Sequence, residues 1–141
     1  MAVEIDIAYE GQLYCGAVHG PSAAQLRTTA PVDNGGTGDQ FSPTDLLATA
    51  LGTCMLTIMG IVGQRAGLDL TGTKVKVIKE MTAVPVRRIG RLAVTITLPP
   101  GLALSEKDRT SLENAADTCP VKQSLHPDVV VNTEFVLESQ G

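Results

Sequence analysis

The sequence predicts an α+β fold in which groups of antiparallel strands accompany a long apolar helix. Short runs of alternating apolar and polar residues lie near both ends of the chain, as expected for strands with one covered face. Between the first three runs and the rest lies the segment Ser42 to Leu68, which is apolar or small at almost every position. A second helical pattern follows later in the chain. The predicted order is therefore βββ-α-ββ-α-β.

Length and composition predict one folded domain over residues 1–141. Of the 141 residues, 43% are hydrophobic and 18% are charged, which supplies a core and argues against disorder. The net charge of −4 and the aromatic content of 3% argue against a nucleic-acid partner, which requires basic surfaces and rings for stacking. The first residues include acids and no basic, apolar start, so we expect no signal peptide and a cytoplasmic location.

The N-terminal part predicts a three-stranded antiparallel meander. Apolar and polar residues alternate from Val3 to Tyr9, and shorter alternations cover Leu13 to Val18 and Ala24 to Ala30. Glycine-containing turns separate the three runs, and the first strand is expected to be half-buried. The Gly-rich segment 31–40 lacks the Lys-Ser/Thr of a phosphate-binding loop. It is either a flexible connection or a lid or rim over the thiol of Cys54 in the central helix.

The central segment carries the end signals of a single helix. Ser42 is a favourable N-cap, Pro43 suits the first helical position, and Asp45 occupies the capping-box position. Gly67 is a stop signal. Because the helix is apolar around most of its circumference, we expect it to be buried in a core or in a dimer interface. Its length would also suit a membrane span, but the caps and the surrounding strands favour a fold with no membrane partner.

The C-terminal half predicts two further strands, a helix, a short helical turn and a last strand. Alternation covers 68–81, where Lys74, Lys76 and Lys79 are expected to form a solvated basic face, and continues over 87–99. We expect these strands to be antiparallel.

The second helix is expected to begin at Ser105, with Asp108 at the capping-box position. Its apolar face ends at Cys119, which is followed by Pro120 at the first position of a short helical turn. Alternation from Val129 to Leu137 predicts the last strand.

Three cysteines, Cys15, Cys54 and Cys119, do not fit a secreted disulfide scaffold, because their number is odd. Cys54 lies in the central helix, where a cysteine is most often a small buried hydrophobe. Cys119 is either an ordinary capping residue or a reactive thiol. In the second case the N–H groups of the turn and the charge of Lys122 would lower its pKa and favour the thiolate.

Two kinds of chemistry fit these residues. In one, a thiol attacks an electrophile, becomes a sulfenic acid and condenses with the other thiol to a disulfide. In the other, a metal ion is bound, because Cys15-x-x-x-His19 has ligand-like spacing and Cys54, Cys119 and His126 could be recruited. Four residues along a strand span about 13 Å, however, so one ion could not take Cys15 and His19 without a bend. His126, before Pro127, also suits a turn.

Two motifs resemble those of the OsmC/Ohr family. Ser42 to Cys54 (Ser-Pro-Thr-Asp-Leu-Leu-Ala-Thr-Ala-Leu-Gly-Thr-Cys) is similar to the family's central-helix motif, and Ala115 to Val121 (Ala-Ala-Asp-Thr-Cys-Pro-Val) is similar to its second motif. Their order and the chain length match over essentially the whole sequence, and the general OsmC-like branch is the better match. The resemblance implies an OsmC-like fold, an intertwined homodimer with active sites at the interface, and peroxidase activity on organic hydroperoxides in oxidative-stress defence.

The resemblance also implies roles for individual residues. Cys54 corresponds to the peroxidatic cysteine of the family and Cys119 to the resolving cysteine. The family uses an arginine and an acid to hold the sulfur as a thiolate, for which Arg27 and Asp45 are the first choices here. Asp45 precedes Cys54 by ~13 Å along the helix axis, so a contact between them would have to cross the dimer. Arg87 or Arg88 could take the place of Arg27.

No cofactor and no metal are expected, and the disulfide would be reduced by a dithiol, which the resemblance suggests carries lipoyl groups. Apolar walls formed by Leu51, Met55 and Met59 are expected to favour an organic hydroperoxide over hydrogen peroxide. The alternative is an OsmC-like dimeric ligand-binding or structural protein with weak or no peroxidase activity.

Overall fold

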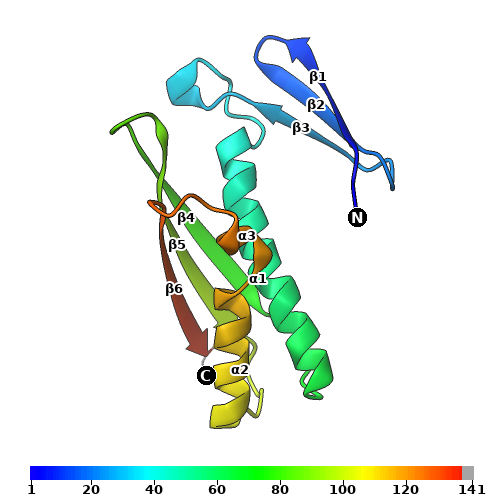
Figure 1. The fold of residues 1–141 in the computed structure, drawn as a ribbon, viewed down its shortest axis with the longest axis vertical. Coiled ribbons are helices and arrows are strands. Elements are labelled where there is room, and N and C mark those ends of the chain that lie inside the picture. The colour runs from blue at the N-terminus through cyan, green and yellow to red at the C-terminus, as the bar shows by residue number, and fades with distance from the viewer. Residues whose placement is uncertain (138–141) are drawn as a thin grey trace. The chain divides into compact units, whose positions relative to one another are not determined.

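The computed structural model describes residues 1–137 and has the predicted order of strands and helices (Figure 1). The chain divides into two compact units, Met1–Leu47 and Ala48–Gly141, each of which contains one three-stranded sheet. The boundary lies within the long helix α1 (Pro43–Arg65). The single domain over 1–141 stays a prediction.

The first unit contains the predicted antiparallel meander. Its strands are β1 (Ile5–Gly11), β2 (Tyr14–His19) and β3 (Gln25–Thr29), in the order β1-β2-β3. The Gly-rich segment that follows includes one short 3-10 helix, η1 (Val32–Asn34).

The apolar face of this sheet is more exposed than expected. Cross-strand pairing places Ile7 opposite Ala17 and Ala17 opposite Leu26, so these apolar residues of the three strands share one face. The exposed fraction is 58% for Ile5, 69% for Ile7 and 48% for Leu26. The expectation of a half-buried first strand was therefore wrong for the single chain. Alternation identifies the residues that share a face, but it does not say what covers that face.

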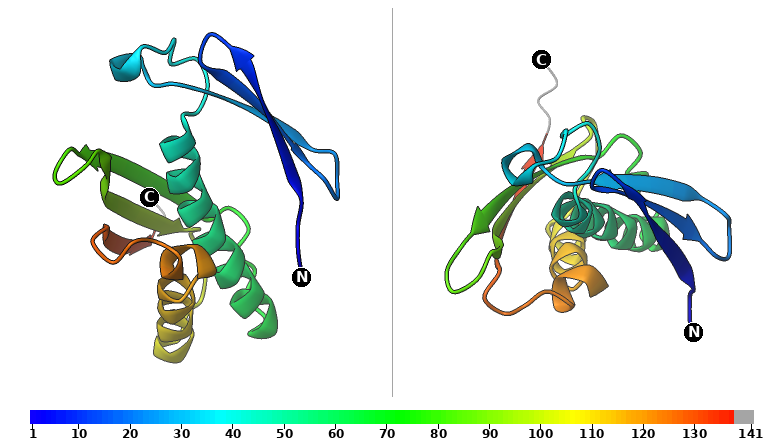
Figure 2. Two further views of the ribbon diagram at one scale, coloured as in Figure 1. Left: turned by 45° about the horizontal axis from the view of Figure 1, so that its top comes forward. Right: turned by 90° about the horizontal axis from the view of Figure 1, so that it is seen from above.

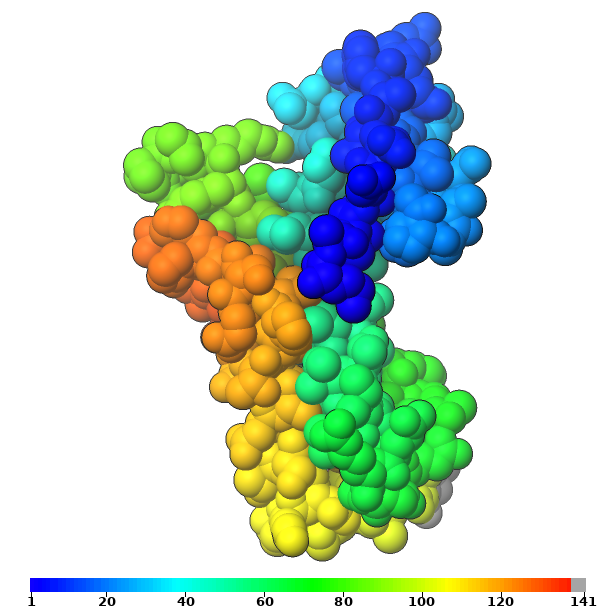
Figure 3. Space-filling model, turned by 45° about the vertical axis from the view of Figure 1, so that its right-hand side comes forward, coloured from blue at the N-terminus to red at the C-terminus, as the bar shows by residue number. Residues whose placement is uncertain are grey.

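The second unit consists of a sheet with helices on one of its faces (Figure 2). Besides most of α1, its elements are β4 (Lys74–Thr82), β5 (Arg88–Leu98), α2 (Glu106–Asp117), α3 (Pro120–Gln123) and β6 (Val130–Leu137). In the space-filling view, α2 in yellow lies beside the second half of α1 in green (Figure 3). The core lies between these helices and the central strand β5, and includes Leu51, Met55, Met59, Leu92, Ile96 and Leu112.

Strand pairing in this sheet differs from the expectation at one place. β4 and β5 are antiparallel, but β5 and β6 are parallel, with Arg91 opposite Val130 and Leu98 opposite Leu137. Helices α2 and α3 connect these two strands. A parallel pair requires a long crossover of this kind, whereas a hairpin joins only antiparallel neighbours.

The basic face expected on β4 also needs a correction. Lys74 and Lys76 are exposed, but Lys79 is half-buried on the face that carries Val77, and the exposed position beside it is Ile78. Because side chains alternate strictly along a strand, residues 77 and 79 must share a face.

The predicted caps of α1 are present. The Asp45 carboxylate accepts a hydrogen bond from the Ser42 backbone N–H at 2.9 Å, and the Ser42 hydroxyl accepts one from the Asp45 N–H at 3.1 Å. At the other end Gly67 has a φ of 71°, and the Leu68 N–H donates to the Gly63 carbonyl at 2.8 Å. These contacts form the expected capping box and a glycine stop.

Among residues 1–137, α1 is the one helix that is long and apolar enough to span a membrane by length and composition. Of its most apolar stretch of 18 residues, 33% is buried. A core helix has the same length and composition. The buried residues of α1 recur at helical spacing along one side, at Ala48, Leu51, Met55, Met59 and Gly63.

Candidate functional site

Cys54 lies at one edge of the buried side of α1 and is half-buried. Its neighbours in sequence, Gly52 and Met55, belong to the buried side, whereas Thr53 is exposed. Cys54 is therefore held by a rigid element while one part of its surroundings stays open.

Cys119 occupies the turn between α2 and α3 and is fully buried. As predicted, it is the N-cap of a helical turn that begins at Pro120, and its sulfur accepts a hydrogen bond from the Lys122 N–H at 3.4 Å. Its carbonyl oxygen accepts a second hydrogen bond from the Gln123 N–H at 3.2 Å. The sulfur and the carbonyl oxygen of Cys119 are thus both held by backbone N–H groups of α3.

The fold brings these two cysteines together. The Cys54 side chain lies close enough to Cys119 to raise the pKa of its thiol, although one residue lies in α1 and the other in the turn before α3, far apart in the sequence. Both are free thiols in this structure. Two adjacent thiols, one half-buried and one buried, can form a disulfide or react in sequence with an electrophile.

Of the two interpretations of Cys119, the structure contradicts the lowered pKa that belongs to the reactive thiol. Burial raises the pKa of the Cys119 thiol above its ordinary value of 9.0, and the Lys122 N–H opposes this only in part. The neighbouring Cys54 raises the Cys119 pKa further. The ammonium group of Lys122 is paired with the Asp117 carboxylate. Cys119 therefore keeps its proton and can donate it toward Cys54.

Arg27 and Asp45, the predicted partners of the thiolate, belong to the first unit, whereas both cysteines belong to the second. The Arg27 Nε donates to Glu10 Oε1 at 2.8 Å, and the guanidinium lies over the ring of Tyr14, 3.9 Å from its centroid. The Asp45 carboxylate caps α1. The structure thus gives both residues a role within their own unit.

Arg88, named as a substitute for Arg27, lies in the second unit and has unused donors. Its Nε and Nη1 atoms are buried and have no hydrogen-bond partner within residues 1–137. Nη2 is 3.8 Å from Asp128 Oδ2, which makes only a long ion pair. A buried guanidinium with free N–H groups has capacity for an acceptor. No pattern in the sequence distinguishes it from Arg87.

The histidines named for the metal alternative have hydrogen-bond partners of their own. Within residues 1–137, no group of three or more His, Cys, Asp or Glu side chains is arranged to hold a metal ion. The His19 Nδ1 is hydrogen-bonded to the Ser22 hydroxyl at 2.6 Å. The His126 Nδ1 accepts a hydrogen bond from the Asp128 N–H at 3.0 Å, as expected for a turn residue.

The residues expected to form apolar walls around Cys54 lie in the core of the second unit. Leu51, Met55 and Met59 have no exposed surface and belong to the core. Helical spacing instead places Ile58 and Ile61, four and seven residues after Cys54, on the same side of α1 as the thiol. Ile58 is half-buried and Ile61 is 40% exposed. The signal that identifies them, the i, i+4, i+7 spacing from Cys54, was present in the sequence.

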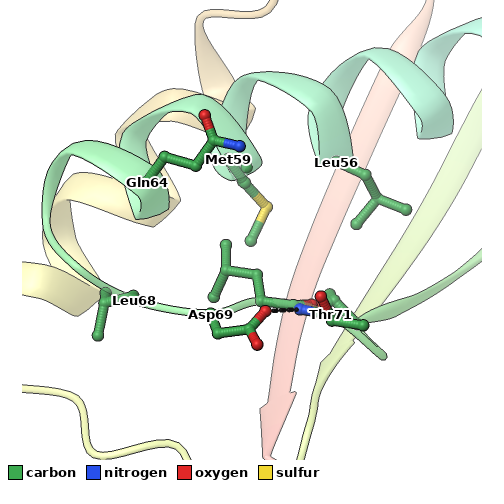
Figure 4. A pocket seen from close by; sticks show the side chains of 9 residues that line it. Leu56, Met59, Gln64, Leu68, Asp69 and Thr71 are labelled. Atoms are coloured by element: carbon green, nitrogen blue, oxygen red, sulfur yellow. Dashed lines mark hydrogen bonds between the residues drawn. The ribbon is translucent and has the colours of Figure 1, made fainter.

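A pocket of about 240 Å³ lies along the opposite edge of α1, between the second half of the helix and the segment that leads to β4 (Figure 4). Leu56, Met59 and Leu68 provide apolar lining, and Gln64, Asp69 and Thr71 provide polar groups. The Asp69 carboxylate accepts a hydrogen bond from the Thr71 N–H at 2.9 Å. Hydrogen bonds from Thr71 lower the Asp69 pKa, so this group is anionic at neutral pH.

Comparison with known proteins identifies relatives over most of the chain. The sequence model of a family described as OsmC-like protein matches residues 36–134. A solved structure of a proposed osmotic stress induced and detoxification response protein from Psychrobacter arcticus is 42% identical, with a TM-score of 0.86 and 93% of each chain covered. No curated protein matches the chain.

Two more distant structures share the fold. An organic hydroperoxide resistance protein OsmC from Legionella pneumophila is 17% identical, with a TM-score of 0.71, over 96% of this chain and 97% of its own. The organic hydroperoxide resistance protein OhrB of Bacillus subtilis is 15% identical, with a TM-score of 0.66, over 96% of this chain and 98% of its own.

Proposed function

Because the chain belongs to the OsmC family, we propose that it is a cysteine-based peroxidase that reduces organic hydroperoxides in oxidative-stress defence. The observation that carries the proposal is the contact between Cys54 and Cys119. The names of the Legionella and Bacillus relatives, which share the fold, are consistent with hydroperoxide as the substrate.

In the first step the Cys54 thiolate attacks the distal oxygen of the hydroperoxide. The sulfur–oxygen bond forms, the oxygen–oxygen bond breaks, and the alkoxide takes a proton from the solvent and leaves as an alcohol. Cys54 suits this role because it is the less buried of the two thiols, and the Cys119 S–H can donate a hydrogen bond to a sulfur anion beside it. Ile58 and Ile61, on the same side of the helix, favour an apolar alkyl group.

In the second step Cys119 resolves the sulfenic acid on Cys54. The Cys119 sulfur attacks the Cys54 sulfur, the sulfur–oxygen bond breaks, and the hydroxyl group leaves with the Cys119 proton as water. A dithiol, such as a lipoyl group, then reduces the disulfide by exchange. No bound cofactor or metal takes part.

The other parts of the proposal concern the surroundings of the thiols. We assign the stabilisation of the Cys54 thiolate to an arginine, either Arg27 or its substitute Arg88, through the positive charge of its guanidinium. Asp45 would contribute across a homodimer with an active site at each interface. The protein would act in the cytoplasm, without nucleic acid or membrane as a partner.

A thiol count on the purified protein tests the proposal. One equivalent of an alkyl hydroperoxide should remove two thiols per chain and produce a Cys54–Cys119 crosslink in a peptide map. Cys54→Ser should abolish the crosslink, whereas Cys15→Ser serves as a matched control that keeps it. Thiols that persist for minutes under this treatment would exclude peroxide reduction as the function.

The pocket beside Leu56 and Asp69 favours a second candidate function, a dimeric ligand-binding protein with weak or no peroxidase activity. Its apolar lining and single anionic group are typical of small-molecule sites. In that case the thiol count would stay unchanged, and a small apolar amine, such as hexylamine, would raise the melting temperature.

A further inference from the structure

The turn that carries Cys119 is bridged by an ion pair that none of the steps above uses. Asp117 is the last residue of α2, and its carboxylate pairs with the ammonium group of Lys122 in α3. The Asp117 carbonyl also accepts a hydrogen bond from the Gln123 side-chain amide at 3.4 Å. Asp117 therefore contacts α3 at two points.

Lys122 connects this bridge to the sulfur. Its side chain pairs with Asp117, and its backbone N–H donates to the Cys119 sulfur at 3.4 Å. A shift of Lys122 away from Asp117 would therefore also move the group that orients the thiol. Cys119 has little freedom to compensate, because it is fully buried and its carbonyl is bonded to α3.

We propose that the ion pair between Asp117 and Lys122 is a positioning clamp that holds the Cys119 sulfur against Cys54 and thereby sets the rate of disulfide closure. This inference rests on the proposed function and concerns its second step, the closure of the disulfide. In that step the sulfur–sulfur bond forms as the sulfur–oxygen bond of the sulfenic acid breaks, and water leaves. The rate depends on how often the two sulfurs are in line and in contact.

The clamp acts through position rather than through charge. The groups that shift the pKa of Cys119 are its buried surroundings, Cys54 and the backbone N–H groups of Lys122 and Val121; the Lys122 ammonium is not among them. Lys122→Met removes the ammonium and keeps both the backbone N–H and most of the side-chain length. This variant therefore separates the clamp from the hydrogen bond to the sulfur.

The expected size of the effect follows from the exposure of the pair. The Lys122 side chain is 25% exposed and that of Asp117 is 68% exposed. Exposed ion pairs are weak, so loss of the clamp should slow closure by roughly two- to fivefold rather than abolish it.

The test measures closure of the Cys54–Cys119 disulfide by diamide, which needs no peroxidase activity. Diamide forms an adduct on the more exposed Cys54, and attack by the Cys119 thiol then expels the reduced hydrazine and leaves the disulfide. The rate of disulfide formation, measured after stopped-flow mixing, should be lower in Lys122→Met and in Asp117→Asn than in the wild type. In Lys122→Arg the rate should equal that of the wild type. The double variant should be no slower than either single variant, because both remove the same contact.

A matched control breaks another ion pair on α2. Arg109→Met removes the contact of the Arg109 Nε with Glu113 Oε1 at 3.1 Å and should leave closure unchanged. Equal closure rates in the wild type and Lys122→Met would overturn the clamp. So would equal slowing in Lys122→Arg, since that variant restores the charge.

A second measurement separates the clamp from the proposed function. With an alkyl hydroperoxide, the clamp variants should form sulfenic acid on Cys54 at the wild-type rate and then close more slowly. If the wild type forms no sulfenic acid, the peroxidase proposal fails, whereas the diamide result still decides the clamp.

Discussion

At Cys119 two opposing influences act on a single sulfur atom. The thiol is taken out of water, which disfavours its anion, and a backbone N–H points at it, which favours the anion. Desolvation is the larger influence, so the pKa is raised. A resolving thiol that keeps its proton while its neighbour reacts has a consistent place in the proposed cycle, because that proton leaves with the hydroxyl group as water.

The raised pKa of Cys119 has a measurable effect on stability. Between the ordinary value of 9.0 and the folded-state pKa, the folded protein holds a proton that the unfolded chain has lost. The stability that this contributes is complete below the ordinary value and is lost as the pH rises through the folded-state pKa. The loss is at most about 1.4 kcal/mol for each pH unit in that window.

Urea unfolding of reduced protein at about pH 8 and about pH 10 checks this pH dependence. The free energy of unfolding of the wild type should fall more between the two conditions than that of Cys119→Ala, which lacks the titrating group. The comparison cancels the titration of the other residues. Equal pH dependence in the two proteins would contradict the assignment.

At the scale of elements, two glycines of α1 have opposite surroundings. A Cβ at Gly52 would lie 3.0 Å from a methyl group of Val77 and 3.3 Å from one of Val75, whereas a Cβ at Gly60 would meet nothing within 4 Å. Gly52 therefore allows the helix to approach β4 closely. Gly60 has no such role within the chain and only weakens the helix.

Substitution at these two positions should change stability in opposite directions. Gly52→Val should destabilise the fold by about 1–3 kcal/mol, because stiff side chains on β4 cannot yield easily. Gly60→Ala should stabilise it by about 0.5–1 kcal/mol through helix propensity. Denaturant unfolding of both variants checks this, and a stabilising Gly52→Val would show that α1 and β4 are not in close contact.

Much of the element order was predictable, because each element carries its own local signals. The capping box of Ser42 and Asp45, the N-cap at Cys119 and the alternation along β5 depend on residues a few positions apart, and all are present in the structure. The errors concern relations between elements. The parallel pairing of β5 with β6 depends on the crossover, and the raised pKa of Cys119 depends on the groups that surround its sulfur.

The candidate site was predictable in part for the same reason. The sequence identified Cys54 and Cys119 as residues of interest, but only the packing of α1 against the turn before α3 brings the sulfurs together. Leu51 and Met55 lie on the side of α1 that packs against the sheet, so these residues, expected to line the site, belong to the core. The buried, unpartnered nitrogens of Arg88 have no local sequence signal at all.

At the scale of the whole molecule, the exposed apolar face of the first unit bears on the proposed homodimer. Ile5, Ile7 and Tyr9 on β1 and Leu26 on β3 are each about half exposed or more. Apolar faces of this kind are typical of surfaces that another chain covers. The acidic residue Asp6 of β1 lies on the opposite face, because successive side chains of a strand alternate.

This difference between the two faces allows a test of the dimer with neighbouring residues. Ile7→Lys places a charge on the apolar face, and in a symmetric dimer it does so twice. Loss of the burial of two isoleucines should weaken association by roughly a hundredfold or more. Sedimentation should therefore show monomers, and peroxide turnover should fall if each active site needs both chains.

Ala8→Lys adds the same charge one residue later, on the opposite face, and should leave a dimer with normal turnover. If Ile7→Lys remains a dimer of unchanged affinity, the apolar face of the first unit is not the dimer interface, and another surface must join the two chains.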